Sequence, residues 1–301
     1  MAETVRVVVD AMGGDNAPAE PVKAAVEAVA EREDIDVILT GRQDVIEKEL
    51  SKFQNYPKER IQIVNTTEVI ETAEPPVLAI RKKKDSSIVV GLNLVKKQEA
   101  EAFVSSGSSG AILVGGQVIV GRSKGVQRPP LAPLIPTQNG VSLLIDCGAN
   151  VDARPEHLVQ FAKMGSIYIN IGAEEEKGNA LVKETFPLLK ECSGINFIGS
   201  IEARDIPAGY ADVIVCEAFV GNVILKLYEG LGSTFMKMLK TGLMKDTRSK
   251  VGALLVKPAV KETMKAFDAS EYGGAPLLGL KGLVVKTHGS ARAVEIRHAI
   301  F

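Results

Sequence analysis

Short runs of apolar and β-branched residues recur along the chain and alternate with segments of helical character. Runs that predict strands lie at residues 5–9, 37–41, 61–64, 102–104, 142–146, 195–201, 211–215 and 283–286. Strands that alternate with helices indicate a mostly parallel sheet that is covered on both faces. We therefore predict an α/β fold, with one α/β catalytic domain over residues 1–301. In such sheets ligands bind beyond the carboxyl ends of the strands.

One region has a different pattern, because residues 228–268 contain no strand signal and predict two helices. A helical spacing of i, i+3, i+4, i+7 and i+8 forms one apolar stripe, made of Phe235, Met238, Leu239, Gly242 and Leu243. Residues 235–266 contain eight Lys and Arg against two acidic residues, a local charge of +6. We expect a helical arm over residues 228–271 that protrudes from the α/β domain.

Composition places the chain among globular proteins with a large core, since 46% of its 301 residues are hydrophobic and 24% are charged. The net charge of −1 gives no support to nucleic-acid binding. Three scattered cysteines and three histidines, with no CxxC pair, predict neither a zinc site nor a disulfide framework. The start of the chain lacks a signal-peptide pattern, and no long apolar run occurs. We expect a cytoplasmic protein that could still contact a membrane surface.

The first glycine-containing loop, D-A-M-G-G-D at residues 10–15, directly follows a predicted strand. Gly13 and Gly14 would allow a ligand to approach the backbone closely, and Asp10 and Asp15 could accept hydrogen bonds. The alternative is a tight turn in which Asp15 or Asn16 caps the next helix. The loop is not G-x-G-x-x-G, so a dinucleotide site is not favoured.

A second loop, S-S-G-S-S-G at residues 105–110, lies between the run at 102–104 and an apolar segment at 111–121. A strand, a Gly/Ser loop and a helix start offer backbone N–H groups and hydroxyls to an anion. The loop lacks the lysine of a Walker motif, which disfavours a nucleoside triphosphate. A flexible linker would leave the apolar flanks unburied. We predict a phosphate-binding loop with these candidate residues: Ser105, Gly107, Ser108, Ser109 and Gly110.

Two further candidate regions lie in the middle of the chain. Arg128 is followed by two prolines that fix an extended backbone, and it could point into a cleft or be solvated. Asp146 and Asn150 belong to D-C-G-A-N-V-D, which follows the predicted strand at 142–146. This arrangement repeats the strand-then-Asp pattern of the first loop.

The last candidates are a lysine and a histidine near predicted strand ends. Asn222 could cap a helix that brings Lys226 over the site one turn later, where an ammonium group is a workable ligand for phosphate. The alternative is an ordinary surface lysine. His288 ends the predicted strand at 283–286, and it is the best general acid or base among the three histidines.

A series of motifs, in order and nearly from end to end, resembles the bacterial phosphate acyltransferase family of phospholipid synthesis. These motifs are D-A-M-G-G-D (10–15), R-P (128–129), D-C-G-A-N-V-D (146–152), N-F-I-G (196–199), E-A-R-D (202–205), F-V-G-N (219–222), Y-G-G-A (272–275), L-G-L-K-G (278–282) and H-G-S (288–290). Several motifs together are far more specific than any one of them.

The resemblance implies a three-layer α/β/α Rossmann-like sandwich of the isocitrate/isopropylmalate dehydrogenase and phosphotransacetylase type, in a homodimer. It implies transfer of a fatty acyl group from acyl carrier protein to inorganic phosphate, without a cofactor or a metal. The acyl phosphate product would pass to a membrane glycerol-3-phosphate acyltransferase.

For this reaction we expect phosphate itself to attack the thioester, so that catalysis rests on positioning and on stabilisation of the oxyanion. The loop at 105–110, with Lys226 or Arg128, would hold phosphate. His288 or a backbone N–H would stabilise the oxyanion, or His288 would protonate the departing thiolate. Three residues would orient these groups: Asp10, Asp146 and Asn150.

The chain departs from the family pattern at three places. Ser108 and Ser109 stand where the family usually has Asn and Thr. The junction at 170/171 is shorter than the family's loop and strand, and a further Ser-Asp is missing at 290/291.

The basic arm has more than one possible use. The cations Lys237, Lys240, Lys245 and Arg248 could steer the acidic acyl carrier protein or contact anionic lipid. The alternative is a dimer-packing arm with a solvated face. For the whole chain, the competing functions are a phosphotransacetylase-like enzyme that uses acyl-CoA, a nicotinamide dehydrogenase, and a non-catalytic adaptor that recruits the carrier protein to a membrane.

Overall fold

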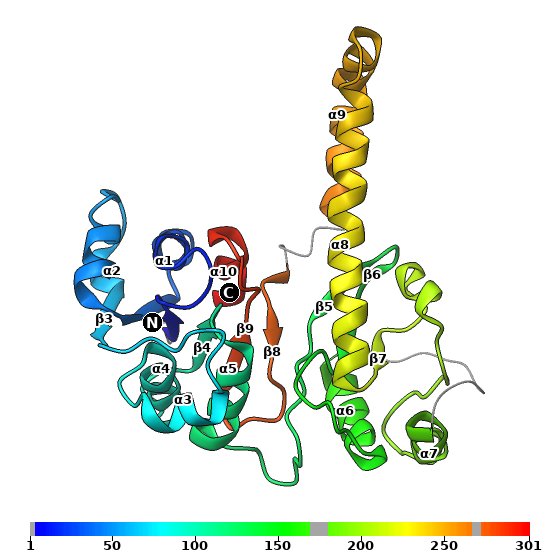
Figure 1. Cartoon of the computed structure of the whole chain (residues 1–301), viewed down its shortest axis with the longest axis horizontal. Coiled ribbons are helices and arrows are strands. Elements are labelled where there is room, and N and C mark those ends of the chain that lie inside the picture. Colours follow the sequence, from blue (N-terminus) through cyan, green and yellow to red (C-terminus); the bar gives the residue numbers. More distant parts are fainter. Residues whose placement is uncertain (1–3, 169–179, 267–271) are drawn as a thin grey trace. The chain divides into compact units, whose positions relative to one another are not determined.

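The computed structural model of the chain describes residues 4–168, 180–266 and 272–301 (Figure 1). The chain divides into two compact units. The first unit contains residues 1–131 and 270–301, and the second contains residues 132–269. The single domain over residues 1–301 stays a prediction.

The sheet of the first unit has the strand order β3-β2-β1-β4-β9-β8. Its strands are β1 (Val5–Asp10), β2 (Ile35–Gly41), β3 (Ile61–Asn65), β4 (Ala102–Ser105), β8 (Ala275–Pro276) and β9 (Leu283–Lys286). All neighbours are parallel except β8 and β9. The chain builds outward from β1 to β3 and then returns to the other side of β1 to form β4. The strand order therefore reverses between β1 and β4, which is where open α/β sheets bind ligands.

Helices cover both faces of this sheet, and the alternation of β1 explains why. Val7 and Val9 lie in a core cluster with residues of three helices: α1 (Ala19–Glu31), α2 (Gln43–Leu50) and α10 (Ala293–Ile300). Val8 points to the opposite face and lies in a cluster with residues of α3 (Pro76–Lys82), α4 (Ser87–Lys96), α5 (Ser109–Gly115) and η2 (Gly116–Val120). Successive strand side chains point to opposite faces, so a run of valines serves two cores. The unit has three layers, helices on sheet on helices (Figure 1).

The second unit has a smaller sheet with the order β5-β6-β7, in which β5 (Leu134–Thr137) is antiparallel to β6 (Gly140–Ile145) and β7 (Val213–Val215) is parallel to it. On one face Gly165 of α6 (Pro155–Tyr168) lies against Val213 and Leu143. On the other face the core includes residues of η3 (Ala203–Ala208) and α8 (Ala218–Leu243). The remaining helix, α7 (Ala180–Lys190), packs on α6.

The predicted helical arm corresponds to α8 and α9 (Thr247–Ala266), which lie side by side and extend beyond the sheet of their own unit (Figure 1). The first helix begins at Ala218, ten residues before the predicted start of the arm. Its apolar stripe is largely exposed in this single chain, with exposed fractions of 62% for Phe235 and 68% for Met238.

Most of the predicted strands are confirmed, but the one at residues 195–201 is wrong for the part of the chain that the structure describes. This segment has no strand and only an isolated β-bridge at Gly199, and its Phe197 ring packs edge-to-face on Phe186 of α7 at a centroid distance of 5.0 Å. Phe197 therefore packs against a helix, while Ile201 packs on the core of the small sheet. The short strands β5 and β8 were not among the predicted runs. The predicted short junction at 170/171 lies outside the described residues.

Candidate active site

Three neighbouring parallel strands of the first unit end at the same edge of the sheet. Val9 of β1 pairs with Val104 of β4, and Ser105 of β4 pairs with Lys286 of β9. The residues that follow these strands form three loops at 10–18, 105–110 and 287–291. The sequence placed Asp10, Ser105 and His288 at strand ends, and the topology brings their loops together.

A hydrogen-bonded chain joins Asp10 to the second loop. The Ser105 hydroxyl donates to Asp10 Oδ2 at 2.6 Å, and the Gly107 N–H donates to Ser105 Oγ at 2.9 Å. The other carboxylate oxygen, Oδ1, accepts the N–H of Met12 at 3.0 Å. Asp10 is 1% exposed, so this carboxylate fixes the start of the loop from inside the protein.

Burial raises the pKa of Asp10 above its ordinary value, because the charged form loses its hydration. Hydrogen bonds from Ser105 and Ser87 act in the opposite direction, as do those from the backbone of Met12 and Gly13. Ser87 lies in the first turn of α4 and was not a candidate from the sequence.

The glycines of the first loop permit the loops to pack on one another. A Cβ atom on Gly13 would lie 2.4 Å from Asp10 Oδ2 and 2.7 Å from the backbone nitrogen of Gly107. Gly14 has a φ of +96°, and a Cβ there would lie 2.8 Å from the carbonyl oxygen of Gly289. The space that the sequence suggested for a ligand at these two glycines is occupied by neighbouring backbone. A role in binding phosphate for Gly13, Gly14 and Asp15 stays a prediction.

The loop at residues 105–110, here called the cradle, leads into α5 as predicted. Ser106 Oγ lies 2.6 Å from Thr287 Oγ1, in a bond that either hydroxyl can donate. Ser108 is the N-cap of α5, and Ser109 and Gly110 form its first turn. First-turn N–H groups have no acceptor within a helix, and the helix dipole favours an anion at that end. The cradle can therefore present N–H groups and hydroxyls to an anion.

The third loop is tied to the other two by backbone hydrogen bonds. The Thr287 N–H donates to the Ser105 carbonyl at 3.0 Å, and the Asp15 N–H donates to the Gly289 carbonyl at 2.8 Å. The Asn16 side-chain amide donates to the Ser290 carbonyl at 2.9 Å. The alternative in which Asp15 or Asn16 caps the next helix is wrong, since α1 has no side-chain cap and its N-cap residue is Pro18. Asn16 instead binds the loop that contains the 290/291 junction.

His288 lies exposed on this third loop. Its Nδ1 accepts the Ser290 N–H at 3.2 Å and lies 2.7 Å from Ser290 Oγ. A ring nitrogen that accepts a backbone N–H carries no proton, so the neutral ring has its proton on Nε2. His288 can thus act as an Nε2–H donor.

Lys286 is a cation that the sequence reasoning missed. It is only 9% exposed, it pairs in register with Ser105, and its Nζ donates to the Thr287 carbonyl. Because Lys286 lies on the strand next to Ser105, it is a source of positive charge beside the cradle. The signal in the sequence was a lysine that ends an apolar strand run, L-V-V-K at 283–286.

Arg128 lies exposed in the loop between η2 and Leu131. The hydrogen bonds and ion pairs of the described residues do not connect it to the cradle. Its contact with phosphate stays a prediction.

The second unit has its own strand-end carboxylate, Asp146, which is completely buried. It accepts the Ala149 N–H at 3.1 Å, the Asn150 N–H at 2.7 Å and the Asn150 side-chain amide at 2.7 Å. The two predicted residues are therefore together, and they hold the loop that follows β6 in a tight turn.

The start of α8 rests on this turn. A Cβ atom on Gly221 would lie 1.8 Å from the carbonyl oxygen of Asp146 and 2.9 Å from Cys216 Sγ. Only glycine allows the helix backbone to approach β6 so closely. The motif F-V-G-N owes its glycine to this contact.

The expectation that Asn222 caps the helix is wrong, because the helix begins earlier. Glu217 is the N-cap, and its carboxylate accepts the N–H groups of Phe219 and Val220 at 2.7 and 2.8 Å. Lys226 is half-exposed and forms an ion pair with Glu229 at 2.8 Å. Roles for Asn222 and Lys226 toward phosphate stay predictions.

Two cysteines of the second unit offer no reactive thiolate. Burial raises the pKa values of Cys147 and Cys216 well above the ordinary range. Within the described part of the chain, no group of three or more His, Cys, Asp or Glu side chains could hold a metal ion. No described helix combines the length and the apolar character needed to cross a membrane.

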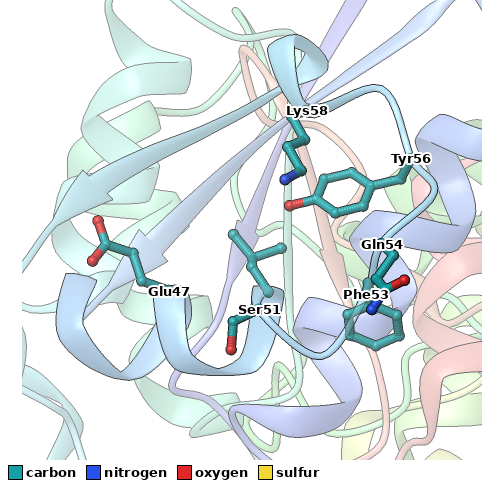
Figure 2. Close-up of a pocket in the computed structure, with 7 residues that line it drawn as sticks. Glu47, Ser51, Phe53, Gln54, Tyr56 and Lys58 are labelled. Carbon is teal, nitrogen blue, oxygen red and sulfur yellow. The ribbon is translucent and has the colours of Figure 1, made fainter.

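A surface cavity of about 580 Å³ lies elsewhere, on α2 and the loop that follows it (Figure 2). Its lining includes Phe53, Tyr56 and Lys58, and Figure 2 shows the Lys58 and Tyr56 side chains directed toward each other. None of the predicted site residues lines it.

The sheet topology and the loops at the ends of β1, β4 and β9 define a three-layer α/β/α protein of the phosphotransacetylase fold. The chain is similar in fold to a phosphotransacetylase from Streptococcus pyogenes, with a TM-score of 0.63 and 17% identity over 99% of this chain and 92% of that chain. It is also similar to the EutD phosphotransacetylase from Staphylococcus aureus, with a TM-score of 0.60 and 15% identity over 99% of this chain and 92% of that chain. At such identities the similarity shows the fold alone.

Sequence relatives are much closer. Residues 5–301 match the family described as fatty acid synthesis protein. A phosphate acyltransferase from Alkaliphilus oremlandii is 52% identical, over 98% of this chain and 92% of the relative. One from Clostridium botulinum is 49% identical, over 98% of this chain and 93% of the relative. The chain belongs to the phosphate acyltransferase family.

Proposed function

We propose that the protein transfers a fatty acyl group from acyl carrier protein to inorganic phosphate and releases acyl phosphate for phospholipid synthesis. The observation that carries the proposal is the cradle, which is hydrogen-bonded to buried Asp10 and leads into the first turn of α5. Membership of the phosphate acyltransferase family supports the same reaction.

In this proposal phosphate binds to the cradle. Its oxygens accept N–H groups of Ser109 and Gly110 and the hydroxyl of Ser108, and Lys286 supplies the positive charge. The family usually has Asn and Thr at positions 108 and 109, so Ser108 replaces an amide with a hydroxyl and Ser109 keeps a hydroxyl. Arg128, Asn222 and Lys226 stay additional predicted ligands.

The reaction needs one new bond and one broken bond. A phosphate oxygen attacks the thioester carbonyl carbon, the C–S bond breaks, and the carrier thiolate leaves and takes up a proton. No covalent enzyme intermediate is required, because phosphate is the nucleophile. His288 Nε2–H would donate to the oxyanion or to the thiolate, and preorganised donors of this kind are worth about 10²–10³ in rate. Asp10, through Ser105, would act as a positioning residue.

The alternative donor is acyl-CoA, and the phosphotransacetylase fold is the observation that favours it. The two donors share the thioester and the attack by phosphate. They differ in the partner that the protein surface must recognise.

The test is phosphate-dependent release of free thiol from acyl carrier protein, with acyl-CoA measured in parallel. We expect thiol release that requires phosphate and favours the carrier protein. Faster turnover of acyl-CoA would support the alternative, and no thiol release from either donor would refute acyl transfer.

A variant assay tests the cation in the cradle. Lys286→Met should raise the KM for phosphate about tenfold or more, because it removes a charge-assisted contact of about 1.5–3 kcal/mol. Lys281→Met is the matched control, since Lys281 is exposed on the same unit. An unchanged KM for phosphate in a folded Lys286→Met protein would remove Lys286 from the site.

The proposed setting is a homodimer in the cytoplasm that reaches the inner face of the membrane and passes acyl phosphate to a membrane glycerol-3-phosphate acyltransferase. The exposed stripe of α8 and the arm cations Lys237, Lys240, Lys245 and Arg248 support contact with a second copy, with anionic lipid or with the carrier protein. Analytical ultracentrifugation and vesicle sedimentation distinguish the first two.

A further inference from the structure

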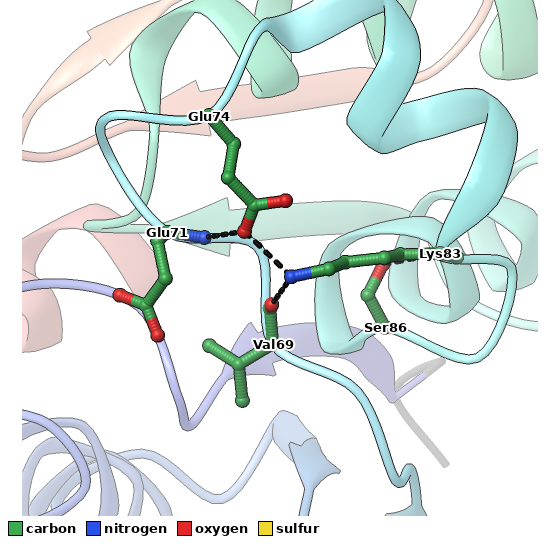
Figure 3. Close-up of polar contacts among 5 residues, drawn as sticks. All are labelled: Val69, Glu71, Glu74, Lys83 and Ser86. Carbon is green, nitrogen blue, oxygen red and sulfur yellow. Dashed lines mark hydrogen bonds and ion pairs between the residues drawn. The ribbon is translucent and has the colours of Figure 1, made fainter.

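The first unit has a run of four cations, R-K-K-K at residues 81–84, at the end of α3. One of the four points inward: Lys83 Nζ donates to Glu74 Oε1 at 2.5 Å and to the Val69 carbonyl at 2.6 Å (Figure 3). The same Glu74 oxygen accepts the Glu71 N–H at 2.8 Å. Lys83 therefore fixes the loop that leads into α3, and its charge is neutralised.

The other three cations, Arg81, Lys82 and Lys84, are exposed. Among the described residues none of them forms an ion pair, and Lys84 Nζ donates only to the Ile80 carbonyl at 3.2 Å. The carboxylate of Asp85 is engaged by Thr67. Many other surface cations of this unit do pair with carboxylates: Arg6 with Glu101, Arg32 with Asp34, Arg42 with Asp44 and Lys52 with Glu49. The end of α3 thus presents three cations outside any described ion pair, although the carboxylates of Asp85 and Glu68 lie nearby.

Two apolar side chains lie beside these cations. Val77 is 54% exposed and Leu78 is 51% exposed, whereas Ala79 and Ile80 of the same helix are buried. Residues four apart on a helix are neighbours, so Val77 lies beside Arg81 and Leu78 beside Lys82. One helix therefore presents an apolar pair bordered by cations.

This surface begins next to the cradle. A Cβ atom on Gly110 would lie 2.5 Å from Pro76 Cγ, so the first residue of α3 touches the first turn of α5. A helix of this length spans about 10 Å at 1.5 Å per residue. The cations at its far end therefore lie about one helix length from the residue that touches the first turn of α5.

We propose that the exposed face of α3, made of Val77, Leu78, Arg81, Lys82 and Lys84, docks the acidic carrier protein that delivers the acyl thioester. The inference rests on the proposed function and assigns its partner a place beside the cradle. Positive charge without acidic partners complements an acidic carrier and speeds its encounter, while the apolar pair supplies contact area. The carrier would then present its thioester to phosphate without leaving this side of the unit.

The test compares charge reversal on α3 with the same change elsewhere. The variant is Arg81→Glu with Lys82→Glu and Lys84→Glu, and the control is Lys48→Glu with Lys58→Glu and Lys96→Glu, three exposed lysines of the same unit. Carrier-protein binding is measured by fluorescence titration at low and moderate salt. We expect the Kd to rise about tenfold or more in the α3 variant, with a weaker salt dependence, and to change less than about twofold in the control.

Kinetics with two donors complete the test. The KM for acyl carrier protein should rise in the α3 variant, while turnover of a short uncharged acyl-pantetheine thioester stays unchanged. Circular dichroism verifies folding, and replacement of the three cations by glutamine should give an intermediate Kd.

Several outcomes would overturn the inference: an unchanged carrier Kd, an equal loss in the control, loss of carrier binding only when Lys237, Lys240 and Lys245 are reversed, or a variant that loses only its binding to phosphatidylglycerol vesicles. Failure of the proposed function gives a different result. A wild-type protein that binds the carrier through α3 but releases no thiol would refute the reaction and retain the docking surface.

Discussion

Asp10 and Asp146 are buried carboxylates at strand ends, one in each unit. Their hydrogen bonds join them to residues at very different separations along the sequence. Asp10 bonds Ser105, which is 95 residues away on the neighbouring strand. The Asp146 carboxylate accepts the N–H groups of Ala149 and Asn150 and the Asn150 side-chain amide, all within four residues. One carboxylate links two strands, and the other shapes its own loop.

This difference assigns the two carboxylates different roles, one in positioning the anion site and one in supporting the fold. Through Ser105 and Gly107, Asp10 fixes the cradle, where an anion can bind. Asp146 instead holds a turn whose backbone carries the start of α8 at Gly221. A change at Asp10 should therefore affect activity first, and a change around Asp146 should affect stability first.

The largest expected effect is on stability, in Gly221→Ala. The new methyl group would lie 1.8 Å from the Asp146 carbonyl oxygen, and both backbones are buried. We expect a loss of about 3 kcal/mol or more in the free energy of unfolding, measured with denaturant.

Gly230→Ala is the control in the same helix, because a Cβ there has no neighbour within 4 Å. Alanine is the better helix former, so this variant should gain up to about 1 kcal/mol. Equal stability of the two variants would show that α8 does not depend on its contact with the Asp146 turn.

The next effect is smaller and compares the two carboxylates directly. Asp146→Asn places an NH₂ group among three N–H donors, which should cost about 1–3 kcal/mol of stability. Asp10→Asn can keep the Met12 N–H on its oxygen, and the Ser105 hydroxyl can turn to accept. It should cost less stability but lower kcat for phosphate-dependent thiol release about tenfold or more, because the cradle shifts.

Unfolding and turnover are measured on both variants. The assigned roles are reversed if Asp146→Asn lowers kcat without lowering the free energy of unfolding. They are also reversed if Asp10→Asn lowers the free energy of unfolding while the folded molecules keep the wild-type kcat.

The sequence predicted much of the first unit because its signals are local. The apolar runs at 5–9 and 37–41 predicted β1 and β2, and the Gly/Ser loop between a strand and an apolar segment predicted the cradle and the start of α5. The alternation of Val7, Val8 and Val9 is sufficient to place helices on both faces.

The features that were missed depend on distant contacts. The burial of Lys286 follows from its neighbour β4, and the need for glycine at position 13 follows from Gly107, neither of which is visible locally. The segment at 195–201 is not a strand, and its Phe197 packs on Phe186 of α7, a contact that the apolar run alone does not reveal. The cap expected at Asn222 is wrong because α8 begins earlier, at Ala218, and Glu217 is its N-cap.

The smallest expected effect is the pH dependence that burial gives to Asp10. Its pKa is raised in the folded protein, so the folded state holds this proton more tightly than the unfolded state, whose Asp pKa is about 3.9. As pH rises from about 4 through the raised value, the wild type should lose stability relative to Asp10→Asn, and below about pH 4 the difference should be constant. The effect is limited because hydrogen bonds from Ser105 and Ser87 oppose the burial.

Asp34→Asn is the control of opposite sign: Arg32 lowers the pKa of Asp34, so there the wild type should gain stability relative to the variant as pH rises toward 4. Denaturant unfolding of the three proteins between pH 3 and 7 measures both slopes, and parallel curves for wild type and Asp10→Asn would show that Asp10 is not held in a desolvated site.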